Sequence, residues 1–150
     1  MIPLRIGRLS LRIHVVLALI AGGLALLGGD LWLRYLLLVG TLFMHELAHA
    51  AVALALGDKQ AVVSLWPWGG VAHVEAFGDI REAVVALAAP AANLAVAAGF
   101  ALAGARFDLM LGQCPLRDFV FTANLLMGVG NLVPLPFLDG GRAFRILRKA

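Results

Sequence analysis

Two histidines and a glutamate lie within a long apolar stretch, and this placement restricts the fold of the chain more than any other feature. The motif HELAH at residues 45–49 interrupts an otherwise apolar run over residues 36–56. His45 and His49 share one face of a helix, so both imidazoles can reach one zinc ion while Glu46 stands beside the metal to activate water. The spacing is typical of zinc metalloproteases, and its surroundings predict a site inside a membrane.

Burial of three ionisable groups in lipid is costly unless a metal compensates for it. Each group near the bilayer centre costs about 2.5–3.5 kcal/mol, whereas binding of a structural zinc ion contributes about 10–16 kcal/mol. The alternative is a coincidental motif in the core helix of a soluble protein, with hydrogen-bonded His and Glu side chains. The chain has only 4 histidines, so a chance match is improbable and we favour the metal site.

The composition is that of a membrane protein. Hydrophobic residues make up 62% of the chain and charged residues 14%, against about 45–50% and about 25% in soluble domains. The net charge of +3 comes from arginines near the ends of apolar segments, where positive charge sets the orientation of membrane helices. The arginines do not form a nucleic-acid surface, so we do not expect nucleic acid as a partner. Cys114 stands alone, so neither a disulfide framework nor a cysteine zinc site is expected.

These features predict an all-α polytopic membrane protein with one membrane-embedded core over residues 1–150. Arginines before the first apolar segment place the N-terminus on the cytoplasmic side. The same pattern can be a cleaved signal peptide, but Leu26-Leu27-Gly28-Gly29 is a poor cleavage site. About four transmembrane helices fit the length, and we expect them at about 11–28, 31–56, 81–104 and 117–150, the last broken at 132–138.

A β-hairpin is expected at about 60–77, between the second and third helices. Two β-prone stretches flank the turn Pro67-Trp68-Gly69-Gly70, and tryptophans there suit a membrane interface. Two roles remain open for this hairpin. Its edge can accept an extended peptide by strand addition, or the hairpin can be a connector that rests on the membrane without substrate contact.

The third apolar segment, Ala83 to Ala103, contains Pro90 and Asn93. A buried asparagine needs a hydrogen-bond partner, and we favour a role of Asn93 in helix packing over a role in catalysis. Residues 106–118 are expected to form a polar connection on the outer side of the membrane.

The segment from Asn131 to Gly141 cannot be a continuous helix. Pro134 and Pro136 remove backbone donors, and unwound backbone at membrane depth is tolerated only where it lines protein or a cavity. Helical rise places both His49 and Asp139 about 9–10 Å inside the cytoplasmic boundary. Because catalytic zinc usually takes three protein ligands, Asp139 is the expected third ligand, although it can also cap the following helix. The other candidates are less well placed: His73, Glu75, Asp79, Asp108 and Asp118.

Four motifs resemble the core of the site-2 protease family of intramembrane zinc metalloproteases. In chain order they are HELAH at 45–49, WPWGG at 66–70, AAPAAN at 88–93 and NLVPLPFLDGG at 131–141. The resemblance implies that His45, His49 and Asp139 bind one Zn²⁺ ion and that Glu46 is the general base. It also implies that Asn131 helps to hold the substrate or to stabilise the reaction centre.

The resemblance has further implications for the rest of the chain. Asn93 would be a packing or pore residue, and Ala89-Pro90 stands where the family has Gly-Pro. The compact branch without a PDZ domain fits best, with a partner chain or further C-terminal helices completing the gate. The expected substrate is a transmembrane protein, such as an anti-sigma factor or a membrane-bound transcription-factor precursor. The protein would reside in the inner or plasma membrane, with its active site towards the cytoplasm.

Three other functions are alternatives to an intramembrane protease. A non-catalytic membrane zinc scaffold, or an inactive homologue that regulates a partner, would use the same ligands in a closed site. A different HExxH peptidase with a glutamate as third ligand is disfavoured because no glutamate follows Glu82. A zinc transporter would need polar ligands along a path across the bilayer, whereas here they cluster at one depth.

Overall fold

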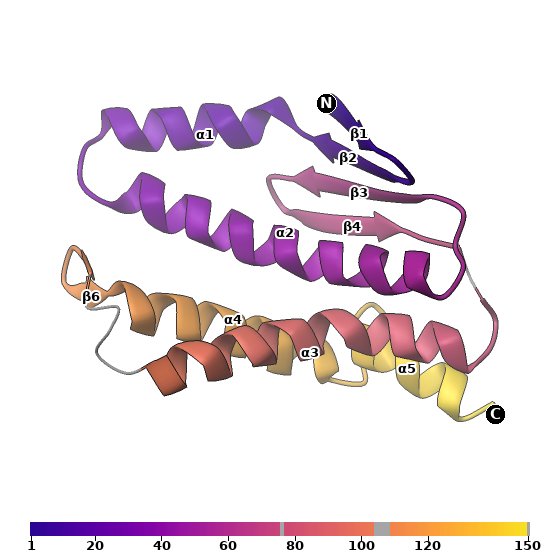
Figure 1. The fold of residues 1–150 in the computed structure, drawn as a ribbon. Coiled ribbons are helices and arrows are strands. Elements are labelled where there is room, and N and C mark those ends of the chain that lie inside the picture. Colours follow the sequence, from indigo (N-terminus) through magenta and orange to yellow (C-terminus); the bar gives the residue numbers. More distant parts are fainter. Residues whose placement is uncertain (76, 104–108, 150) are drawn as a thin grey trace.

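Helix α2 carries the HELAH motif and lies between two groups of elements (Figure 1). The computed structural model describes residues 1–75, 77–103 and 109–149. Helix α1 and a four-stranded sheet lie on one side of α2, and α3, α4 and α5 lie on the other. The elements are β1 (Ile2–Ile6), β2 (Leu9–Ile13), α1 (Val15–Leu26), α2 (Leu31–Ala55), β3 (Ala61–Trp66), β4 (Gly69–His73), α3 (Ile80–Ala103), β5 (Met110–Leu111), β6 (Cys114–Pro115), α4 (Leu116–Leu132) and α5 (Asp139–Leu147).

The sheet has the strand order β1-β2-β3-β4, which leaves β4 at one edge. β1 and β2 are antiparallel, β2 runs parallel to β3, and β3 and β4 are antiparallel. Leu11 of β2 and Val63 of β3 pack with Ala50 of α2 in a buried apolar cluster. This packing fixes the sheet against the part of α2 that carries the histidines.

The all-α expectation is wrong for the N-terminal segment, because residues 1–13 form strands. Leu9-Ser10-Leu11-Arg12-Ile13 alternates apolar and polar residues, which is the pattern of a half-exposed strand. The first helix was expected to begin at about residue 11, whereas α1 begins at Val15. The expected antiparallel pair after α2 is present as β3 and β4, but as half of a larger sheet.

Two helices in the described ranges, α2 and α3, are long and apolar enough to cross a membrane. α1 has 12 residues and is about 18 Å long, shorter than a hydrocarbon core of about 30 Å. Four spanning helices therefore stay a prediction, and the structure supports two of them by length and composition.

The second half of the chain contains the expected helix break. α4 ends at Leu132 and α5 begins at Asp139, with Pro134 and Pro136 in the connection. α5 packs on α3 through Ala143, which contacts Ala83 and Ala86. The polar connection expected at 106–118 lies partly outside the described residues. Its described part contains the short hairpin β5–β6 and the start of α4.

Candidate metal centre

His45 and His49 lie on consecutive turns of α2, and Asp139 approaches them from the first turn of α5. His45 Nε2 is 3.1 Å from Asp139 Oδ2, and His49 Nε2 is 3.2 Å from Asp139 Oδ1. The side chains of the histidines are 5% and 9% exposed and that of Asp139 is 17% exposed. The structure therefore brings together the three residues that were predicted as metal ligands from stretches about 90 residues apart.

The other nitrogen of each imidazole is already engaged. His49 Nδ1 lies 2.8 Å from the Val85 carbonyl oxygen, and His45 Nδ1 lies 2.6 Å from Asn93 Oδ1. A carbonyl oxygen can only accept, so Nδ1 is the donor and Nε2 of the neutral ring presents a lone pair. Two such nitrogens and a carboxylate facing one another form a ligand set that could hold a metal cation.

The donor set fits zinc. Two imidazole nitrogens and one carboxylate are ligands that zinc takes in catalytic sites. The two imidazole nitrogens lie 3.1 and 3.2 Å from the two Asp139 oxygens, and the three ligand atoms of the set all lie within 4.8 Å of one another. Within the described ranges, no other three His, Cys, Asp or Glu side chains bring their ligand atoms this close together.

The remaining ligand candidates lie elsewhere. Asp79 pairs with Arg81 at 2.9 Å, and Asp118 pairs with Arg117 at 3.0 Å. Asp108 lies outside the described residues. Asp139 does not cap α5 either: the N-cap position is Leu138, and no side chain makes a capping hydrogen bond there.

Glu46 lines the same cleft, which has a volume of about 270 Å³. The cleft is also lined by β4, because the backbone of Gly70 lies directly on the Glu46 side chain. A Cβ at Gly70 would be 2.5 Å from Glu46 Cγ. The absence of a side chain at Gly70 therefore allows β4 to reach the predicted general base, a contact that the sequence argument did not foresee.

Asn131 and Arg142 complete the polar lining of the cleft. Asn131 donates from Nδ2 to the Met127 carbonyl at 3.0 Å, one turn back in α4. Arg142 was not predicted; it lies one turn after Asp139 and pairs with Glu82 of α3 at 3.0 Å. This ion pair joins α5 to α3 beside the cleft.

Two glycines after Asp139 permit a close approach of α5 to the broken segment. A Cβ at Gly140 would overlap the Leu132 carbonyl, and a Cβ at Gly141 would overlap the Leu135 carbonyl. Any side chain at these positions would push α5 away from the connection. The glycines thus let Asp139 reach the two histidines.

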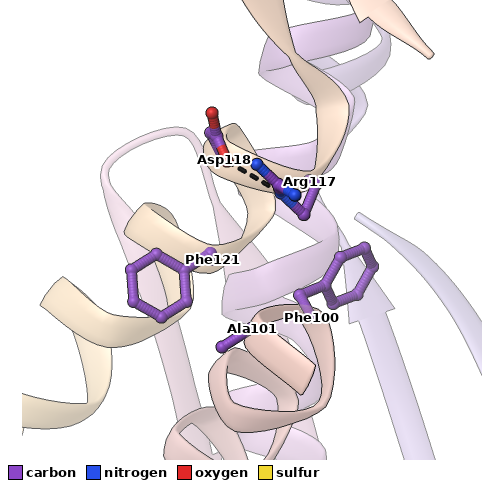
Figure 2. Close-up of a pocket in the computed structure, with 5 residues that line it drawn as sticks. All are labelled: Phe100, Ala101, Arg117, Asp118 and Phe121. Carbon is purple, nitrogen blue, oxygen red and sulfur yellow. Dashed lines mark hydrogen bonds and ion pairs between the residues drawn. The ribbon is translucent and has the colours of Figure 1, made fainter. Parts of the chain in front are cut away.

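A second cavity of about 310 Å³ lies where the end of α3 meets the start of α4 (Figure 2). It contains the ion pair between Arg117 and Asp118. Among the described residues that line it there is no imidazole and no second carboxylate, so these residues offer no metal or acid–base chemistry like that of the cleft at His45. Its lining residues are Phe100, Ala101, Arg117, Asp118 and Phe121.

Comparison with curated proteins points to zinc metalloproteases, although no protein-family model matches the chain. Rip3 of Mycobacterium tuberculosis, named as a zinc metalloprotease, is 38% identical over 116 residues, covering 73% of this chain and 29% of that protein. Zinc metalloprotease MJ0392 of Methanocaldococcus jannaschii is 28% identical over 127 residues, covering 83% of this chain and 38% of that protein. The chain thus spans less than two-fifths of the length of these relatives.

Comparison with solved structures also points to a protease. The site-2 protease from Methanocaldococcus jannaschii matches with a TM-score of 0.76 and 26% sequence identity. The match covers 98% of this chain and 71% of that structure. The likeness in fold therefore extends over nearly the whole of this chain.

Proposed function

Because this chain belongs to the site-2 protease family of zinc metalloproteases, we propose that it is an intramembrane endopeptidase with one Zn²⁺ ion held by His45, His49 and Asp139. The observation that carries this proposal is the convergence of two imidazole nitrogens and a carboxylate on one polar cleft. Catalytic zinc usually keeps one position open beside three protein ligands. Three ligands beside a cleft therefore favour an enzyme over a closed, non-catalytic zinc scaffold.

A zinc ion held by His45, His49 and Asp139 would supply Lewis acidity, which would polarise the scissile carbonyl and make water a stronger acid. The Glu46 carboxylate takes a proton from the attacking water and passes it to the leaving amine. Asn131 holds the substrate or donates to the oxyanion. The Asn131 amide nitrogen has two N–H groups, so one can keep its bond to the Met127 carbonyl while the other serves this contact.

The substrate class is a membrane-anchored protein that is cleaved in or near its transmembrane segment. A substrate helix hides its backbone groups, so it must unwind before attack. β4 is an edge strand, and Gly70, Val71 and Ala72 line the cleft. An unwound substrate can add to this edge as a further strand, which would hold its backbone extended beside the metal. Anti-sigma factors and membrane-bound transcription-factor precursors are substrates of this kind.

We place the protein in the cell inner or plasma membrane, with the N-terminus and the cleft towards the cytoplasm. The two long apolar helices support membrane insertion. Leu11 of β2 packs with Ala50, next to His49 in the chain, so the N-terminal strands and the metal ligands lie near each other. The arginines of the N-terminal strands then mark the side of the membrane on which the cleft opens.

Removal of the metal tests the proposal. A chelator is expected to stop cleavage of a transmembrane test peptide by the purified chain, and added Zn²⁺ is expected to restore it, because the water is too weak an acid without the metal. Cleavage is followed by mass spectrometry of the products, with zinc content measured on the same samples. Full cleavage by protein that contains no detectable zinc would refute the proposal.

Substitution of Gly70 tests the contact between β4 and Glu46. We expect Gly70→Ala to lower the cleavage rate by about 10²-fold, since displacement of a catalytic group by about 1 Å has an effect of this size. Zinc content should not change, because Gly70 lies on Glu46 and not on a ligand. Gly99→Ala is the matched control, since a Cβ at Gly99 meets open space. Equal cleavage rates for Gly70→Ala and Gly99→Ala would show that the contact does not position Glu46.

A further inference from the structure

Two buried asparagines connect His45 to the neighbouring helices. His45 Nδ1 lies 2.6 Å from Asn93 Oδ1 of α3, and Asn93 Nδ2 donates to Asn124 Oδ1 of α4 at 2.8 Å. Asn93 is 2% exposed and Asn124 is 3% exposed. The three side chains therefore form one continuous hydrogen-bonded path across α2, α3 and α4, behind the metal centre.

The contact of Asn124 with a backbone carbonyl of α4 fixes the orientation of both amides in this path. Asn124 Nδ2 donates to the Val120 carbonyl at 2.9 Å and reaches Thr41 Oγ1 at 3.4 Å. A backbone carbonyl cannot donate, so the amide nitrogen of Asn124 must face it and the oxygen must face Asn93. Asn93 is then held with its nitrogen towards Asn124 and its oxygen towards His45.

This fixed orientation determines the tautomer of His45. Asn93 Oδ1 can only accept, so the proton of the neutral imidazole must lie on Nδ1. Nε2, which faces Asp139 at 3.1 Å, is then left with a free lone pair. If Asn93 turned over, its amide would donate to Nδ1, the proton would move to Nε2, and that nitrogen would be blocked for a metal.

We propose that Asn93 is a positioning residue that holds His45 in its metal-binding tautomer, and that Asn124 locks Asn93 in the orientation this requires. The proposal rests on the proposed zinc site and gives Asn93 a more specific role than the packing or pore role expected from the sequence. Partners that orient the second nitrogen of a ligating histidine typically change metal affinity by about 10–100-fold when they are removed.

His49 provides an internal control for this proposal. Its Nδ1 donates to the Val85 carbonyl, a backbone group that no side-chain substitution removes. Only the His45 half of the site depends on side chains for its tautomer. Changes at Asn93 or Asn124 should therefore alter His45 and leave the ring of His49 unaffected.

Zinc affinity of two variants separates positioning from packing. The probe is Zn²⁺ alone, titrated against a coloured chelator into the full chain. Asn93→Leu keeps the volume and removes the acceptor, and it should weaken zinc binding by about 10–100-fold. Asn93→Asp keeps an acceptor for Nδ1–H and should bind zinc within a few-fold of the wild type. A purely structural role predicts the reverse order, with Leu tolerated and Asp worst, and this result would overturn the proposal.

A second measurement does not depend on zinc. Nitrogen-15 spectra of metal-free protein with labelled histidines report the tautomer of each ring, and the chain has only 4 histidines to assign. The neutral ring of His45 should carry its proton on Nδ1 in the wild type, because Asn93 Oδ1 accepts it. It should shift towards Nε2 in Asn124→Leu, where Asn93 itself is intact.

The two readouts distinguish this proposal from the proposed function. A wild-type chain that binds no zinc, yet shows the expected His45 tautomers, would contradict the zinc site and support the orienting path. Zinc binding by the wild type with an unchanged His45 tautomer in Asn124→Leu would overturn the orienting path alone.

Discussion

Replacement of Glu46 by Gln is expected to abolish cleavage of a transmembrane substrate while zinc remains bound. Glu46 is not among the three groups that converge on the metal position, so its loss leaves the ligand set intact. Gln has nearly the same shape as Glu, but its amide cannot take a proton from water. General acid–base catalysis contributes about 10²–10⁴-fold to such reactions, so the loss of rate should reach at least this range.

The measurement combines single-turnover cleavage with zinc analysis of the same purified samples. Glu75→Gln is the control, because Glu75 is exposed and does not line the cleft. It should cleave at the rate of the wild type. Cleavage by Glu46→Gln at that same rate, with one zinc per chain, would remove Glu46 from the mechanism.

Replacement of Asp139 by Ala is expected to remove both zinc and activity. Division of about 10–16 kcal/mol among four ligands gives about 2.5–4 kcal/mol for each, which corresponds to about 10²–10³-fold in zinc affinity. Two imidazoles on one helix would remain, without the carboxylate that α5 contributes. The loss of activity should therefore parallel the loss of zinc.

Comparison with a second aspartate isolates the ligand effect. Asp79→Ala removes an exposed carboxylate that pairs with Arg81 and lies outside the cleft. It should keep the zinc affinity and cleavage rate of the wild type. Asp139→Ala protein with undiminished zinc affinity would mean that the two motifs do not share a metal, even if activity were lost.

The convergence of His45, His49 and Asp139 was predictable because most of its signals are local. HELAH places two imidazoles on one helix face at a fixed spacing, and helical rise gives their depth. The prolines before Asp139 end α4 wherever the rest of the chain lies. Only the contact of Asp139 with the histidines of α2 is non-local. It was anticipated because His49 and Asp139 are expected at similar depths below the membrane boundary and because the motifs resemble those of a known family.

Other features were not predictable because they depend on packing between distant segments. The N-terminal strands are stabilised by the parallel pairing of β2 with β3. The sequence of residues 1–13 does not indicate that β3 is the strand with which β2 pairs. The contact of Gly70 with Glu46 depends on how the sheet lies on α2. The bond between Asn93 and His45 likewise depends on the rotation of α3 against α2, which apolar periodicity does not fix.

The central claim is that α2 and α5 together hold one metal ion, and anomalous scattering at the zinc absorption edge tests it most directly. A crystal of the zinc-loaded wild-type protein should show one peak at about 2.0–2.2 Å from His45 Nε2, His49 Nε2 and an Asp139 oxygen. A bound zinc ion at another position, or one at the histidines with the Asp139 carboxylate far from it, would contradict this account.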